Sequence, residues 1–160
     1  MDRVNKILEN DDFKRLVVDI EELEKDRIFC HHDMDHFLDV ARIAVIMASD
    51  ENIPIDRELI YAAALLHDIG RGKQYRCGTP HEEASAKLAP SILMACDFSD
   101  EETGRITEAI RQHGNETVKD RSDLTGILYR ADKASRKCFK CAATDKCHKA
   151  IEKRVMRIKY

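Results

Sequence analysis

The chain has 160 residues, of which 36% are charged and 43% hydrophobic, and its net charge is −3. This composition predicts a soluble globular protein, and its mildly acidic balance argues against a surface that coats nucleic acid. No apolar run approaches the roughly 18 residues of a membrane span, and the N-terminal MDRVNKILEN lacks a signal-peptide core, so we expect a cytoplasmic protein that does not insert into membranes.

Helical periodicity runs through most of the chain, and strand-like alternation is scarce. The expected helices cover approximately residues 2–27 (with a break near Asn10), 31–49, 54–70, 80–89, 99–114 and 120–132, with a last one near 144. We find no internal repeat and no linker. The pattern therefore predicts an all-α fold: a single domain over residues 1–160, built as a bundle of about six to seven helices, with a cysteine-containing tail over 136–160.

Capping signals define several of these boundaries. Pro54 and Asp56 open the third helix, and Gly70 is expected to close it. Thr79-Pro80-His81-Glu82 has the pattern of a capping box with Pro at the first helical position, and Ser99-Asp100-Glu101-Glu102 has the pattern of a second box. We expect Pro90 to stop the helix that the first box begins.

Five of the expected helices place a His or an Asp on their apolar, inward face. The residues are His36, His67, His81, His113 and Asp132, and Asp68 adjoins His67 at a helix end. A buried carboxylate is costly unless it is paired or binds a metal, and imidazole with carboxylate suits first-row divalent ions. Helices that converge on one point commonly build such a site in all-α domains.

Each of these residues, taken alone, has an ordinary structural explanation. A single His on an apolar face is usually a hydrogen-bonded core residue, and an Asp at a helix end is usually a cap. The metal hypothesis rests on the coincidence of five helices in residue type and direction. His31, His32 and His148 lack such a stripe, and we expect the first two of them to lie at a helix start.

The segments HFLDVARIA, ALLHDIG and YRADKAS resemble the three signatures of the HD-domain superfamily of metal-dependent phosphohydrolases. The resemblance covers approximately residues 26–136. It implies that His36, His67, Asp68 and Asp132 ligate a first metal, which would be Fe, Mn, Co, Ni or Zn. A single HD dyad is a weak motif, but the dyad with both flanking signatures is a specific one.

Two further segments, PHEEASAKLA and AIRQHG, resemble the additional histidine segments of binuclear HD proteins. They imply a second metal held by His81 and His113, with Asp68 bridging both ions. This pattern is shared with HD-type phosphodiesterases and with a bacterial family similar to diadenosine tetraphosphate hydrolases. The GYP signature of the phosphodiesterase subgroup is missing, which makes cyclic-di-GMP a poor candidate substrate.

The resemblance implies hydrolysis of a phosphate ester or anhydride of a small nucleotide-like substrate by a metal-activated hydroxide. Many members have a Lys shortly after the dyad, whereas this chain has Arg71 and then Lys73; these would neutralise phosphoryl charge, or else belong to a solvated loop. Two other functions stay open: a di-iron oxygenase with the same six ligands, and a non-catalytic metal or redox sensor. A homodimer is expected by analogy alone.

The six cysteines are expected to be reduced thiols or metal ligands. KCFKCAATDKCHK contains a C-x2-C-x5-C pattern at Cys138, Cys141 and Cys147, and Cys30 precedes the His36 helix. Four cysteinates could hold a structural zinc ion or an iron–sulfur cluster. The alternative is a set of free thiols whose pKa is lowered by neighbouring lysines. Cys77 and Cys96 are expected to be unpaired.

Overall fold

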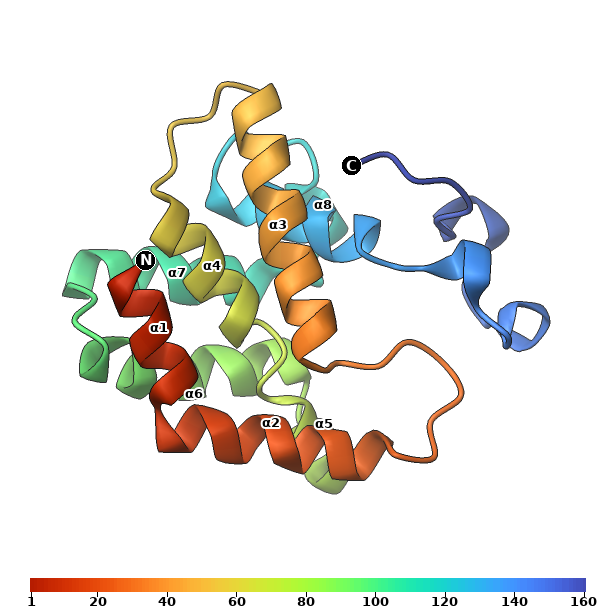
Figure 1. Cartoon of the computed structure of the whole chain (residues 1–160), viewed down its shortest axis with the longest axis horizontal. Coiled ribbons are helices and arrows are strands. Elements are labelled where there is room, and N and C mark those ends of the chain that lie inside the picture. Colours follow the sequence, from red (N-terminus) through yellow and green to blue (C-terminus); the bar gives the residue numbers. More distant parts are fainter.

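A computed structural model, which describes all 160 residues, consists of eight α-helices and four short 3₁₀ turns (Figure 1). The α-helices are α1 (Asp2–Glu9), α2 (Asp11–Glu24), α3 (Met34–Asp50), α4 (Arg57–Leu66), α5 (Arg71–Cys77), α6 (His81–Ala95), α7 (Asp100–Gln112) and α8 (Leu124–Ala134). The 3₁₀ turns are η1 (Glu116–Val118), η2 (Cys138–Lys140), η3 (Thr144–Lys146) and η4 (Ile151–Lys153). The prediction of an all-helical bundle is confirmed. None of the helices combines the length and the apolar character needed to span a bilayer.

The core lies where α3, α4, α6, α7 and α8 pack against one another. The apolar stripes recognised in the sequence face this core, and Ile106, Ala109 and Ile110 of α7 are fully buried. α1 and α2 run along the outside of the bundle, and the tail after α8 leaves it on the same side as the loop between α2 and α3 (Figure 1). The stripes therefore direct the polar residues at their ends toward one point.

Three of the predicted boundary signals are confirmed. The Asn10 side chain accepts a hydrogen bond from the backbone N–H of Phe13, so it ends α1 and caps α2. Ser99 and Glu102 form the reciprocal capping box of α7. Asp56 also accepts from the backbone of the first turn of α4.

Other boundary predictions were wrong. α6 begins at His81, but no side chain of the predicted Thr79 box caps it, and Pro90 lies inside the helix instead of ending it. A proline in a helix costs about 3 kcal/mol, whereas burial of a large aliphatic side chain contributes about 1.5–3 kcal/mol. Ile92 and Leu93 are both buried in the core beyond the proline, so their burial offsets the lost hydrogen bond.

The segment after α4 also differs from the expectation. α4 ends at Leu66, a turn follows, and the short helix α5 was not predicted. At the C-terminus, the helix expected near residue 144 is only the 3₁₀ turn η3. The tail from 136 onward contains no α-helix, because it lacks the periodic apolar residues that would fix one against the core.

Candidate metal centre

Asp68 lies at the middle of the candidate metal centre. His67 and Asp68 follow α4 directly, in the turn that leads to Gly70. Both side chains are completely buried, because the apolar stripe of α4 carries the chain into the core before it turns. A carboxylate buried in this way requires compensating charge or hydrogen bonds.

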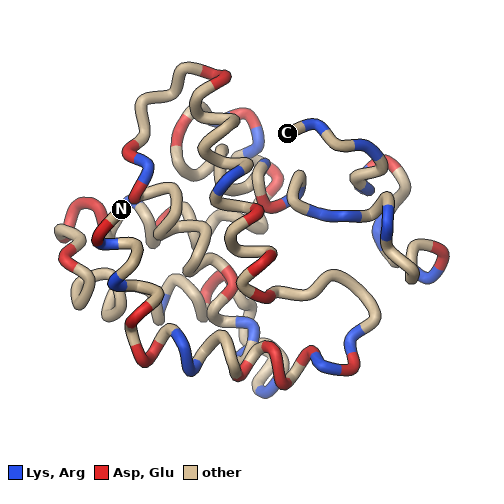
Figure 2. The backbone as a smooth tube through the Cα atoms, in the orientation of Figure 1, with Lys and Arg blue, Asp and Glu red and all other residues tan.

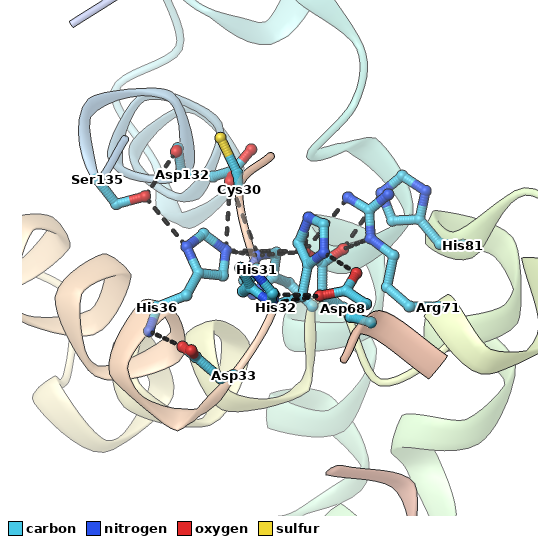
Figure 3. A network of polar contacts seen from close by, with 12 residues as sticks. Cys30, His31, His32, Asp33, His36, Asp68, Arg71, His81, Asp132 and Ser135 are labelled. Carbon is cyan, nitrogen blue, oxygen red and sulfur yellow. Dashed lines mark hydrogen bonds and ion pairs between the residues drawn. The ribbon is translucent and has the colours of Figure 1, made fainter. Parts of the chain in front are cut away.

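The histidines predicted from the sequence surround this carboxylate. Its Oδ2 atom lies 3.3 Å from Nε2 of His67 and 3.7 Å from Nε2 of His36. Its Oδ1 atom lies 3.3 Å from Nε2 of His81 and 3.6 Å from Nε2 of His113. Figure 3 shows His36 and His81 on opposite sides of Asp68. The donor atoms thus form two groups, one on each carboxylate oxygen.

Asp132 of α8 joins the group on the Oδ2 side. Its Oδ1 atom lies 3.6 Å from Nε2 of His36 and 3.9 Å from Nε2 of His67. One donor atom each from His36, His67 and Asp132 lies within 4.8 Å of the others, and the same holds for His67, Asp68 and His113. Each of these groups could hold one metal ion.

The histidine rings are oriented as metal ligands. Nδ1 of His67 donates to the backbone carbonyl three residues earlier at 2.7 Å, and Nδ1 of His113 does the same at 2.6 Å. Because a carbonyl only accepts, the proton of each ring lies on Nδ1, and Nε2 carries a lone pair. Nε2 of His67 lies 3.3 Å from Nε2 of His36, and Nε2 of His113 lies 3.1 Å from Nε2 of His81. Nitrogens that converge in this way fit an intervening cation.

The charge states also fit a metal. Burial lowers the pKa of His67, and it lowers the pKa of His81 to about 3, so both rings are neutral at neutral pH. Burial alone would raise the pKa of Asp68, but the positive charge of Arg71, which donates to this carboxylate, holds it well below its ordinary value. Burial alone would lower the pKa of His36 as well, but Asp68 and Asp132 raise it. The neutral rings of His67 and His81 beside an ionised carboxylate belong to the donor set that first-row divalent ions take.

Gly70 fixes the approach of α6 to this turn. Its backbone N–H donates to Oγ of Ser85 at 2.8 Å. A Cβ atom at residue 70 would come within 2.5 Å of the backbone oxygen of His81 and of the backbone nitrogen of Ser85. The residue has φ −81°, so it is not a left-handed cap, and the glycine is required for close packing. It thereby positions His81 beside Asp68.

Of the two basic residues predicted to act on the substrate, the structure brings only Arg71 to the site. Its Nε atom donates to Oδ1 of Asp68 at 2.9 Å, and its side chain lines the adjoining cavity. Lys73 lies exposed on α5, outside that cavity, and its charge acts on Asp19 of α2. The prediction for Lys73 therefore receives no support, because the turn after Gly70 directs it away from the metal centre.

A cavity of about 640 Å³ adjoins the metal centre. Its lining is rich in positive charge, with eight basic side chains: Arg27, Arg71, Lys133, Arg136, Lys137, Lys140, Lys149 and Arg154. Nζ of Lys133 donates to Oδ2 of Asp132 at 2.5 Å and to the backbone carbonyl of His113 at 3.1 Å, so a cation stands directly beside the ligand groups. The four cysteines of the predicted second site line the same cavity.

His32 is a site residue that the sequence reasoning missed. It is buried in the loop before α3, its Nδ1 lies 2.5 Å from Oε1 of Glu24, and its Nε2 lies 3.7 Å from Oδ2 of Asp68. Burial alone would raise the pKa of Glu24, but hydrogen bonds from His32 and Tyr75 lower it to about 2. Because His32 lies outside a helix, no apolar stripe marks it; its four-residue spacing from His36 is the signal that could have found it.

Comparison with known proteins agrees with this arrangement. Residues 33–137 match the HD domain family, and the chain belongs to this superfamily of metal-dependent phosphohydrolases. It is 39% identical over all 160 residues to an uncharacterized protein of Clostridium beijerinckii, which it matches along its full length. It also resembles the crystal structure of a "predicted HD superfamily hydrolase" from an uncultured Thermotogales bacterium, with 32% identity and a TM-score of 0.58. That match covers 76% of this chain and 66% of the other.

Proposed function

We propose that this protein is a phosphohydrolase that uses two divalent metal ions to cleave a phosphate ester or anhydride of a small, nucleotide-like anion. The observation that carries the proposal is the division of donor atoms around Asp68. His36, His67 and Asp132 gather on one side of the carboxylate, and His81 and His113 on the other. A carboxylate shared between two groups of imidazoles suits a bridging ligand.

Metal ions bound at such a site supply a hydroxide near neutral pH and polarise the phosphoryl oxygens. The protein's own residues orient the ligands and handle charge. Backbone carbonyls fix the rings of His67 and His113, so that their Nε2 atoms face inward. Arg71 holds Asp68 ionised through Nε and Nη2, and its Nη1 donates to Gln74. Because Arg71 also lines the cavity, a remaining N–H of its guanidinium can bind a phosphoryl oxygen.

The basic lining of the cavity supports an anionic substrate. Eight basic side chains and four aspartates line the cavity, and five of the eight basic residues belong to the tail over residues 136–160. This excess of positive charge favours a ligand with several negative charges. The volume of about 640 Å³ lies within the usual range for small-molecule sites, so a mononucleotide or a comparable phosphate ester is the proposed substrate class.

The experiment is a metal-dependent hydrolysis assay on the full chain, purified without chelator. Mono-, cyclic and dinucleotides are tested with Mn²⁺, Fe²⁺, Co²⁺ and Ni²⁺, and released phosphate or nucleoside is measured together with oxygen consumption. We expect Asp68→Asn and His67→Gln to lose hydrolysis. Gly104→Ala should retain it, since Gly104 lies exposed on α7 away from the site.

Three other results would contradict the proposal. Hydrolysis that persists in the Asp68 and His67 variants would place the reaction elsewhere. Oxygen consumption by the iron-loaded protein, without hydrolysis, would identify an oxygenase. Bound metal with neither reaction in a broad phosphate-ester screen would leave a sensor as the remaining function.

A further inference from the structure

The tail over residues 136–160 has almost no hydrophobic core of its own. Only Cys138 and Ala143 are buried in it, and its regular structure is limited to the 3₁₀ turns η2, η3 and η4. Exposed apolar side chains, such as Ile151 and Ile158, show that hydrophobic burial does not hold the tail in place. Short segments of this kind usually require a cross-link or a metal to keep one conformation.

The tail nevertheless has a defined backbone arrangement. The N–H of Phe139 donates to the carbonyl of Val155 at 3.1 Å, which joins its two ends. The guanidinium of Arg154 donates to the backbone carbonyls of Thr144, Cys147 and Lys149 at 2.9–3.1 Å. The turn that contains Cys147 is therefore fixed from one side by a single arginine, while its thiol remains on the cavity wall.

Four cysteines from two separate segments line the same cavity, but no three of their sulfur atoms lie within 4.8 Å of one another, so a bound metal centre would have to draw them together. Cys30 belongs to the loop before α3, whereas Cys138, Cys141 and Cys147 belong to the tail. All four are free, so no disulfide holds the segments together. The ring of Phe29 packs edge-on against His148, with centroids 5.9 Å apart, which brings the loop and the tail into contact next to the thiols.

The surrounding charge suits an anionic centre. The tail contains nine basic and two acidic residues, a formal charge of +7, and Figure 2 shows these basic residues spread along it. Lys149 and Arg136 of the tail both line the cavity beside the cysteines. Four cysteinates with one divalent ion carry a net charge of −2, which would relieve the repulsion among these cations.

We propose that Cys30, Cys138, Cys141 and Cys147 bind a second, thiolate-ligated metal centre, either a zinc ion or an iron–sulfur cluster, which fastens the tail to the loop before α3. Zinc and iron–sulfur clusters share this all-cysteine ligand chemistry. All four cysteines lie outside residues 33–137, which match the HD domain family. The proposal is independent of the reaction at the His/Asp centre, because the two centres have no ligand in common.

The test is elemental analysis of the full chain, purified anaerobically without chelator, with zinc, iron and acid-labile sulfide measured per chain. We expect either zinc, or iron and sulfide in similar amounts with charge-transfer absorption in the visible range. Cys138→Ser, Cys141→Ser and Cys147→Ser should each lose this metal and keep the metal of the His/Asp centre. Asp68→Asn should do the opposite. Cys77→Ser is the matched control, because Cys77 is exposed at the end of α5 and does not line the cavity.

Alkylation of the native protein with iodoacetamide gives a second measurement that does not depend on purifying the variants. Mass spectrometry should find Cys77 modified and the four cysteines protected, including Cys30, although its side chain is exposed. Denaturation with a chelator should expose all of them. If the four thiols react as readily as Cys77, or if the cysteine variants retain every metal, the proposal is wrong.

Discussion

His32 faces the central carboxylate of the metal centre: its Nε2 atom lies 3.7 Å from Oδ2 of Asp68. Nδ1 of His32 lies 2.5 Å from Oε1 of Glu24, and the Glu24 carboxylate also accepts from the His32 backbone and from Tyr75. A carboxylate that orients a histidine toward a metal site is a common supporting arrangement. His32 thus extends the metal centre beyond the six residues found in the sequence.

The first prediction concerns this arrangement. His32→Phe should reduce metal affinity or turnover by roughly 10–100-fold, the usual effect of removing such support, and Glu24→Gln should reproduce part of that loss. Metal titration and steady-state kinetics measure it, and circular dichroism verifies the helices. Ile28→Ala is the control, because Ile28 is exposed in the same loop and does not line the cavity. Unchanged affinity and turnover in His32→Phe would make His32 a core residue only.

A second prediction separates the two groups of ligands. His81→Gln and His113→Gln should each remove about one metal equivalent and leave the other, because their Nε2 atoms face only Oδ1 of Asp68. Asp132→Asn should instead weaken binding of the metal ion on the Oδ2 side of Asp68. Metal content per chain, measured after equilibration with a fixed free metal concentration, checks both. A metal count that His81→Gln and His113→Gln leave unchanged would indicate a mononuclear centre.

The third prediction compares two glycines. Gly70→Ala forces a Cβ into the backbone of α6, so we expect a destabilisation of about 1–3 kcal/mol and loss of metal from the His81 side. Gly104→Ala meets nothing within 4 Å in an exposed helix interior, and it should stabilise the protein by about 0.5–1 kcal/mol. Urea unfolding measures both. Equal effects would show that α6 adjusts to the methyl group.

The interior of the site was predictable because helical periodicity marks its residues. Ile60, Ala63 and Ala64 determine where His67 points, and all of them are buried as the spacing requires. The same reasoning could not find His32, which lies in a loop and whose position depends on its contact with Glu24 at the end of α2. It also failed at Pro90, where tertiary burial beyond the proline outweighs the local signal. Local patterns determine helix faces, whereas loops and helix ends depend on contacts distant in sequence.

The fourth prediction concerns acid stability at the N-terminus. Nε of Arg3 donates to Oε2 of Glu58 at 2.7 Å, and Nη1 donates to Glu102. The hydrogen bond from Arg3 lowers the pKa of Glu58 to about 2. The ion pair therefore contributes its full stability above pH ~4.5, the ordinary pKa of a glutamate, and this contribution is lost as the pH falls toward 2. The groups are partly exposed, so we expect about 1 kcal/mol at neutral pH.

Arg3→Met is the test of this pair. The difference in the free energy of unfolding between wild type and variant should be largest above pH 5 and shrink progressively below pH 4.5, with chelator in every sample so that metal release does not contribute. A difference that is independent of pH would assign the role of Arg3 to its packing over Phe98, whose ring centroid lies 4.3 Å from the guanidinium carbon.

The ligands of the His/Asp centre are spread from His36 in α3 to Asp132 in α8, the last α-helix of the chain. A ribosome-bound chain therefore lacks a complete set until α8 has emerged and folded against α3. Metal capture must follow synthesis of almost the whole protein, and an ion that arrives earlier meets only part of its coordination sphere. The order in which the chain is made thus restricts when the cell can load it.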